Sequence, residues 1–141
     1  MITIISGTNR NNSNSLRVAK YYQKRLLVNG VESQILPLTE LPINIISPDF
    51  FDKPCEDFKP IQDIITRTQK FLFIIPEYNG SFPGALKILI DSCKFPESFG
   101  DKKCALVGIA TGKYGNIRGV DHFTGIAHYC GMQVMPLKIH I

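Results

Sequence analysis

The sequence predicts an α/β domain in which a five-stranded parallel sheet lies between layers of helices. Two observations predict it. Apolar runs of strand length alternate with segments of helical periodicity, and most of these runs are apolar throughout instead of at every second position. Continuous apolar runs are typical of parallel strands that are buried on both faces. With 141 residues, of which 44% are hydrophobic, the chain fits one globular domain over residues 1–141.

The first part of the chain predicts two strands around one helix. Residues 1–5 are a nearly all-apolar run and predict the first strand. Residues 13–29 repeat apolar side chains at mostly helical spacing, and Gly30 fits a C-terminal cap. Residues 31–38 alternate and predict the second strand. Four prolines predict an irregular segment over residues 37–58.

The second part of the chain alternates between helix and strand. Helices are predicted over residues 58–69, 81–93 and 116–131, and Pro60 stands in the first turn of the first of them, where a missing N–H costs little. Buried strands are predicted over residues 70–76 and 104–111, with a last strand within residues 132–141.

The order of these elements predicts the topology. Right-handed crossovers leave few arrangements of parallel strands. Five strands fit the order 2-1-3-4-5 of the flavodoxin-like three-layer sandwich better than a six-stranded dinucleotide-binding sheet. In such sheets ligands bind outside the carboxyl ends of the strands, near the switch point between the first and third strand.

Composition excludes several classes of protein. The formal net charge of +4 is small and scattered, which argues against a nucleic-acid partner. No apolar run reaches membrane-spanning length, and the first residues lack the basic flank of a signal peptide, so we expect a cytoplasmic protein without a membrane partner. The four cysteines form no CxxC pair, so we predict free thiols and no metal site.

Residues 6–16, SGTNRNNSNSL, lead from the first strand into a helix. Free backbone N–H groups and the positive end of a helix dipole meet at such a turn and favour an anion. The loop adds the side chains of Thr8, Arg10, Ser13, Asn14 and Ser15. It contains neither GxxxxGK[ST] nor GxGxxG, so the pattern fits a lone phosphate monoester held without a metal. A polar turn in which Ser13 or Asn14 merely caps the helix explains this loop equally well.

Two further loops follow buried strands. PEYNGS, residues 76–81, places charged, aromatic and amide groups at the expected ligand edge, which favours contact with a flat ring that carries amide and imide groups. The alternative is a tight Asn79–Gly80 turn with a surface tyrosine. In TGKYGN, residues 111–116, the glycines permit close approach of a ligand to the backbone.

Taken together, these segments resemble the NADPH-dependent FMN reductase family, which is flavodoxin-like and includes azo-dye and quinone reductases. The resemblance rests on GTNRNNSNSL, PEYNGSFPGALKILID and GIATGKYGNIRG…CGMQVMP, and it runs through nearly the whole chain. It implies bound FMN, with its phosphate held by the first loop and its ring held by the second and third. The cofactor-binding residues that it implies are Thr8, Arg10, Ser13, Asn14, Ser15, Pro76, Glu77, Tyr78, Asn79, Gly80, Thr111 and Gly112.

The resemblance implies an NAD(P)H oxidoreductase. Hydride would pass through flavin N5 to a small acceptor such as free flavin, a quinone or an azo compound. No side chain is needed as acid or base, so no catalytic residue is predicted. The alternative is a flavodoxin-like electron-transfer or flavin-binding module without its own turnover, although such carriers are typically acidic and this chain is net positive.

Two departures from the family pattern concern the partner surface. The family's third helix usually reads LKNAID followed by Trp, whereas this chain has LKILIDS from Leu86. The chain also stops at Ile141, where the family would add a last helix, so that helix is expected to be absent. We expect a homodimer or higher oligomer, with helices 81–93 and 116–131 at a two-fold interface. The third helix is apolar over most of its circumference, and Val134, Leu137 or Ile139 of the last strand would otherwise expose apolar surface.

Overall fold

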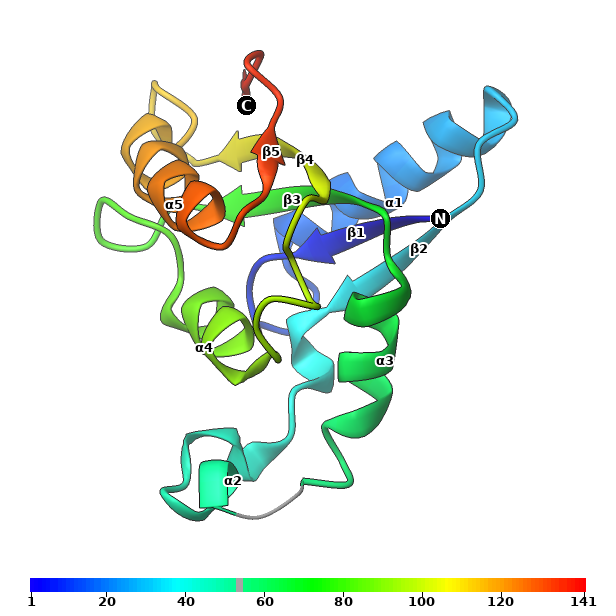
Figure 1. Ribbon diagram of the computed structural model, residues 1–141. Helices are drawn as coiled ribbons and strands as arrows, with labels where there is room; N and C mark the ends of the chain where they lie inside the picture. Colours follow the sequence, from blue (N-terminus) through cyan, green and yellow to red (C-terminus); the bar gives the residue numbers. More distant parts are fainter. Residues whose placement is uncertain (53–54) are drawn as a thin grey trace.

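The computed structural model describes residues 1–52 and 55–141 and shows a parallel sheet with helices on both faces (Figure 1). All strand pairs are parallel, in the order β2-β1-β3-β4-β5, with β6 also paired to β4. The predicted order 2-1-3-4-5 is therefore confirmed. The strands are β1 (Ile2–Ser6), β2 (Ser33–Pro37), β3 (Lys70–Pro76), β4 (Lys103–Ile109), β5 (Gln133–Val134) and β6 (Ile139–His140).

The last strand is broken into β5 and β6, whereas the sequence predicts one strand. β5 pairs with the start of β4 at Lys103, and β6 pairs near its end at Val107. Pro136 lies in the gap and has no N–H to donate to the ladder, which explains why pairing stops there. Both pieces run along the same edge of β4, so together they occupy the fifth position.

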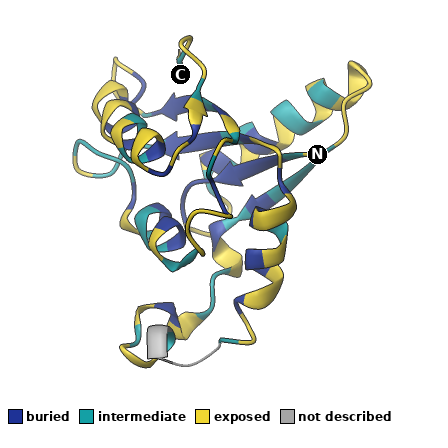
Figure 2. Ribbon diagram, viewed as in Figure 1, coloured by how far each residue is buried: buried dark blue, intermediate teal, exposed yellow. Residues whose placement is uncertain are grey.

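The longer helices lie on opposite faces of the sheet. They are α1 (Asn14–Val28), α3 (Lys59–Arg67), α4 (Gly84–Ser92) and α5 (Ile117–Tyr129). Buried side chains of α3, α4 and α5 join one large core, whereas α1 packs on the other face over Ile4, Ile74 and Val107. Buried residues therefore follow the strands and the inner sides of the helices (Figure 2).

The irregular segment predicted over residues 37–58 begins at the end of β2, and its described residues up to 52 and from 55 on form only short turns of helix. Two 3₁₀ turns span Leu38–Glu40 and Ile43–Ile46, and a four-residue helix, α2, spans Asp49–Asp52. Leu38 and Ile45 are buried in the large core, which fixes this segment against the body of the domain.

Helix α4 is less exposed than its sequence indicates. Leu86, Leu89 and Ile90 are buried in the large core of the same chain. Part of its apolar surface is therefore covered within the same chain, whereas Ala85 and Ile88 remain partly exposed, and a dimer contact through α4 stays a prediction.

Candidate functional site

Three loops meet at the carboxyl edge of the sheet. β1, β3 and β4 end at Ser6, Pro76 and Ile109, and their parallel pairing places these ends side by side. Backbone hydrogen bonds continue beyond the strands, since Gly7 N donates to Ile74 O at 2.9 Å and Glu77 N donates to Ile109 O at 2.9 Å. The three loops therefore leave the sheet as one fixed unit.

A cavity of about 1090 Å³ lies between these loops. This volume lies just above the usual range for cofactor and small-molecule sites, which ends at about 1,000 Å³. All twelve residues predicted as cofactor contacts line it: Thr8, Arg10, Ser13, Asn14, Ser15, Pro76, Glu77, Tyr78, Asn79, Gly80, Thr111 and Gly112.

The first loop begins with a turn that only glycine can make. A Cβ on Gly7 would lie 2.7 Å from Ile74 O, so the backbone passes directly over β3. Thr8 N then donates to Ser6 O at 2.8 Å, and the Thr8 side chain is almost fully buried. The turn thus directs the loop from β1 toward the cavity.

The N-terminus of α1 presents unpaired donors to the cavity. The hydroxyl of Ser13 caps the helix by accepting from Leu16 N at 3.2 Å, as the capping interpretation predicts. In the described part of the chain, no hydrogen bond is found for the backbone N–H groups of residues 11–15. The Ser15 hydroxyl is also buried without a partner, and its residue is 1% exposed. Ser15 shares this state with Ser6 and Ser33, but of the three it is the one that lines the cavity, where a ligand oxygen could satisfy it.

Tyr78 links the second loop to the first. Its hydroxyl lies 2.6 Å from Thr8 Oγ1, and Arg10 Cζ lies 4.5 Å from the centre of its ring. The stacked guanidinium keeps its N–H groups available at the ring's edge, because cation–π contact uses the face of the guanidinium. Arg10 is thereby held over the cavity although no carboxylate pairs with it in the described residues.

The second loop is a tight turn, as its alternative interpretation predicts. Asn79 and Gly80 have φ of 51° and 77°, and Tyr78 and Ser81 exchange backbone hydrogen bonds of 2.8 and 3.0 Å. Two successive positive φ values define a type I′ turn, which favours Asn-Gly. The turn and the ligand interpretation are compatible, because the turn fixes Tyr78 in the cavity wall.

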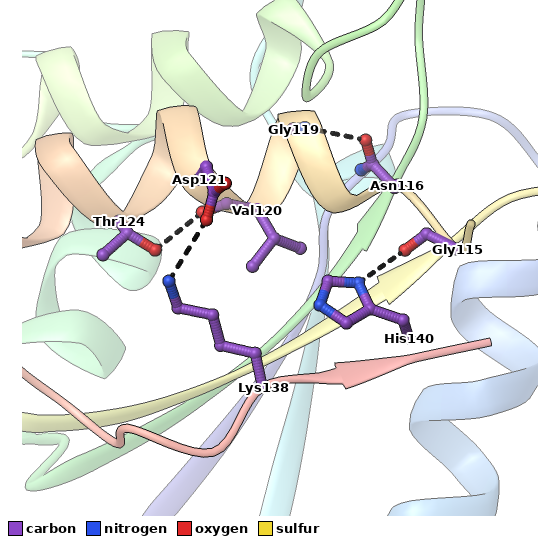
Figure 3. A network of polar contacts seen from close by, with 8 residues as sticks. All are labelled: Gly115, Asn116, Gly119, Val120, Asp121, Thr124, Lys138 and His140. Carbon is purple, nitrogen blue, oxygen red and sulfur yellow. Dashed lines mark hydrogen bonds and ion pairs between the residues drawn. The ribbon is translucent and has the colours of Figure 1, made fainter.

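The third loop is fixed at its far end by Asn116. Its Nδ2 donates to Ile75 O at 3.0 Å, and its Oδ1 accepts from Gly119 N at 3.1 Å. Gly115 just before it accepts a hydrogen bond at 2.9 Å from His140 Nδ1, which comes from β6 (Figure 3). Loop 110–116 is thus held by β3, by α5 and by the C-terminal strand.

Glycines allow this close packing. A Cβ on Gly108 would lie 2.3 Å from Gly115 O, and a Cβ on Gly119 would lie 2.2 Å from Asn116 Oδ1. Larger residues at either position would therefore push the third loop away from the sheet.

Several residues of the cavity wall are not among those predicted from the sequence. Val18, Tyr21 and Tyr22 lie three and more residues beyond Ser15 on α1, so helical periodicity alone places Val18 and Tyr22 on the same face as Ser15. Burial, with a smaller effect from Tyr21, raises the pKa of Tyr22, so this phenol stays neutral. The remaining unpredicted residues of the wall are Asn11, Asn12, Arg17, Ile109, Ala110 and Ile141.

None of the cysteines lines the three-loop cavity. All four are free, and burial raises the pKa of Cys93 to about 12 and that of Cys104 to about 11. A thiol with a raised pKa is a poor nucleophile and a poor metal ligand. Within residues 1–52 and 55–141 there is also no cluster of metal-ligating side chains.

The fold and the three-loop cavity define a flavodoxin-like domain with a cofactor-sized site at the switch point of its sheet. The family model described as NADPH-dependent FMN reductase matches residues 1–140, and the chain belongs to this family. Over the described residues no helix has the length and apolarity needed to cross a membrane.

Curated relatives agree with this assignment. A quinone reductase of Pseudomonas putida is 30% identical over 125 residues, which are 86% of this chain and 65% of that protein. A second quinone reductase of Pseudomonas putida is 27% identical over 124 residues, which again are 86% of this chain and 65% of that protein. This chain therefore spans about 65% of the length of the curated relatives that it matches.

Solved structures show the same architecture. FerB, a flavoenzyme NAD(P)H:(acceptor) oxidoreductase from Paracoccus denitrificans, superposes with a TM-score of 0.82 at 25% identity, covering 97% of this chain and 76% of that one. The apo form of the NADH:FMN oxidoreductase EMOB superposes with a TM-score of 0.76 at 20% identity, covering 94% of this chain and 70% of that one. At 20% identity the second likeness concerns the fold.

Proposed function

We propose that this domain binds FMN in the three-loop cavity and serves as an NAD(P)H-dependent reductase of a small acceptor of the quinone type. The observation that carries the proposal is the buried Ser15 hydroxyl, which has no partner within the described chain and lies in the wall of a cofactor-sized cavity. The family assignment and the names of the relatives, quinone reductase and flavoenzyme NAD(P)H:(acceptor) oxidoreductase, support it.

The phosphate end of FMN fits the first loop. Three kinds of donor have no acceptor among the described residues: the N–H groups of residues 11–15, the Ser15 hydroxyl and the Arg10 guanidinium. The first turn of α1 carries no acidic residue. A helix N-terminus with such donors favours a dianionic phosphate. Arg10 supplies the charge for a forked hydrogen bond, because guanidinium geometry matches phosphate oxygens.

The ring end fits the other two loops. Tyr78 and Asn79 of the second loop and Thr111 and Gly112 of the third loop line the cavity side by side. The backbone N–H groups of Thr111 and Gly112 have no acceptor in the described residues, so they can donate to the ring's polar edge. These two N–H groups would hold the polar edge of a bound ring and would favour negative charge on it.

Bound FMN would supply the redox chemistry, since a flavin accepts hydride from a nicotinamide and passes electrons to a second acceptor. The chain's own residues bind and orient the reactants, and no side chain is assigned as acid or base. A titration of the purified apo protein with FMN and with riboflavin tests the assignment of the two ends. We expect tight FMN binding and markedly weaker riboflavin binding, because riboflavin lacks the phosphate. Equal affinity for the two would remove the role proposed for the first loop.

We further propose that the protein works in the cytoplasm as a homodimer. Four free thiols are consistent with a reducing compartment. Exposed apolar side chains remain on α5 and in the C-terminal segment, where Ile117 is 45%, Tyr129 86% and Leu137 71% exposed. Because Leu86, Leu89 and Ile90 of α4 pack into the core of the same chain, we propose the two-fold contact on α5 and the C-terminal segment. Light scattering of the purified protein tests this, and a monomer at micromolar concentration would contradict it.

A further inference from the structure

A second cavity of about 380 Å³ borders the three-loop cavity, and we call it the side chamber. It shares Glu77 and Gly112 with the larger cavity, so the two spaces meet between the second and third loops. Its wall consists of Glu77, Gly112, Lys113, Tyr114, Ile117 and Arg118.

The side chamber is positively charged. Lys113 and Arg118 outnumber Glu77, and Arg118 Nη2 lies 3.5 Å from Glu77 Oε1. That distance is longer than the 2.7–2.9 Å of a strong charge-assisted hydrogen bond. Lys113 has no ion-pair partner in the part of the chain that the structure describes. Most of the donors of these two cations are therefore available to a ligand.

Arg118 is nevertheless held at the rim of the chamber. A Cβ on Gly80 would lie 3.6 Å from Arg118 Nε, so the guanidinium packs over the Asn79–Gly80 turn. Its side chain is 75% exposed, and it reaches from the first turn of α5 to the second loop. The charge is thus positioned beside the proposed ring site without being buried.

Gly112 keeps the junction of the two cavities open. A Cβ there would meet no atom within 4 Å, and its φ is not positive, so neither packing nor backbone conformation in this chain requires glycine. The neighbouring Gly115 differs, because its φ is 53° and a Cβ would lie 2.6 Å from Ile141 N. At Gly112 the absence of a side chain leaves room for a ligand.

Apolar surface flanks the two cations. Tyr114 is 67% and Ile117 45% exposed, and both line the chamber. A flat aromatic face beside a charge suits a ligand with a planar apolar body and an anionic substituent, because the face covers the body while the cations bind the anion.

We propose that the side chamber binds the anionic group of a planar substrate whose body lies in the three-loop cavity. This inference rests on the proposed function, since it names a substrate class for the same site. The anion is either a substituent of the acceptor or a phosphate of the nucleotide donor. Both share the chemistry that Lys113 and Arg118 recognise.

The test compares Arg118→Gln and Lys113→Gln with the wild type and with Lys24→Gln, which removes an exposed charge on α1 outside both cavities. Naphthalene sulfonate and neutral naphthalene methanol serve as redox-inert probes, and their binding to the FMN-loaded protein is measured from the quenching or shift of flavin fluorescence. Loss of one charge-assisted contact should weaken sulfonate binding roughly three- to tenfold and leave the neutral probe within about twofold.

Steady-state kinetics identify which reactant carries the anion. The values of kcat/KM are measured for a sulfonated naphthoquinone against neutral menadione, and for NADPH against NADH. A selective loss for the sulfonated quinone assigns the chamber to the acceptor, and a selective loss for NADPH assigns it to the nucleotide phosphate. Equal losses for charged and neutral ligands, or a comparable loss in Lys24→Gln, would overturn the proposal. Failure of the FMN-loaded wild type to oxidise NAD(P)H would instead contradict the proposed function, while the binding arm would still test the chamber.

Discussion

The side-chain amide of Asn116 donates to the main-chain oxygen of Ile75 at 3.0 Å, although the two residues are 41 positions apart. Ile75 lies one residue before Pro76, where β3 ends, and Asn116 caps α5 in a left-handed conformation with φ of 60°. This contact ties the end of the third loop to β3, and the bond from Glu77 N to Ile109 O at 2.9 Å ties the start of the same loop to the second loop. Two hydrogen bonds therefore fix the spacing of the second and third loops, which both line the cavity.

Asn116→Asp should destabilise the fold. The substitution keeps the shape and the helix cap but leaves Ile75 O facing a carboxylate oxygen in a buried place. Loss of a buried donor costs about 1–3 kcal/mol, and more when a charge replaces it. Urea unfolding measures the change, with Asn44→Asp at an exposed position as the control. A loss of less than about 0.5 kcal/mol, the scale of a neutral surface change, would contradict this role.

Ser15→Ala should weaken FMN binding without destabilising the apo protein. Its hydroxyl is buried and unpaired within the described chain, so its removal costs the free fold nothing and relieves an unsatisfied group. Loss of its hydrogen bond to a ligand oxygen would weaken FMN binding by about 0.5–1.5 kcal/mol. Thermal unfolding of apo protein and a fluorescence titration with FMN give the two readouts. A variant that binds FMN like the wild type, or whose apo form melts lower, would show that Ser15 serves the fold.

Arg10→Ala should weaken FMN binding by about 1.5–3 kcal/mol, the value of a charge-assisted contact to phosphate. Riboflavin should bind the variant and the wild type alike, because the lost partner is the phosphate. Arg25→Ala, at the far end of α1, controls for loss of charge. If riboflavin loses as much affinity as FMN, Arg10 acts through its stacking on Tyr78.

Tyr78→Ala should change the absorption spectrum of bound flavin more than Ser13→Ala does. Tyr78 forms the ring wall and is fixed by Thr8 and by its turn, whereas Ser13 caps α1. Tyr78→Phe keeps the ring and removes the 2.6 Å contact with Thr8. Its change in the flavin spectrum should therefore lie between those of Tyr78→Ala and Ser13→Ala. Identical spectra for all three variants would place the isoalloxazine elsewhere.

Alkaline pH should destabilise the protein through its buried thiols. Burial raises the pKa of Cys93 to about 12 and that of Cys104 to about 11, above the ordinary value of 9.0. Because the folded pKa values are raised, this contribution is fully present below pH 9 and is lost as pH rises from 9 toward 11 to 12. Urea unfolding at several pH values checks this, and Cys104→Ala should show a shallower decline. An equal decline in the variant would assign the effect to other groups.

The sequence predicts the strands well because buried parallel strands appear in it as continuous apolar runs, such as residues 70–76. It predicts the long helices from the helical spacing of their apolar residues. It predicts the lining residues of the cavity because side chains that follow such strands must emerge at one edge. It could not predict the Thr8–Tyr78 or Asn116–Ile75 contacts, since each joins residues tens of positions apart through rotamers that depend on packing. The broken last strand was missed because Pro136 interrupts pairing without interrupting the apolar pattern.

The central claim is that the three-loop cavity holds FMN and passes electrons from NAD(P)H to a small acceptor. Anaerobic absorbance spectroscopy of the FMN-reconstituted protein, freed of unbound flavin, tests it most directly. The account predicts that stoichiometric flavin stays with the protein, that its visible absorbance bleaches on addition of NADPH or NADH, and that menadione restores it. Folded protein that retains no FMN, or bound FMN that neither nucleotide bleaches, would contradict it.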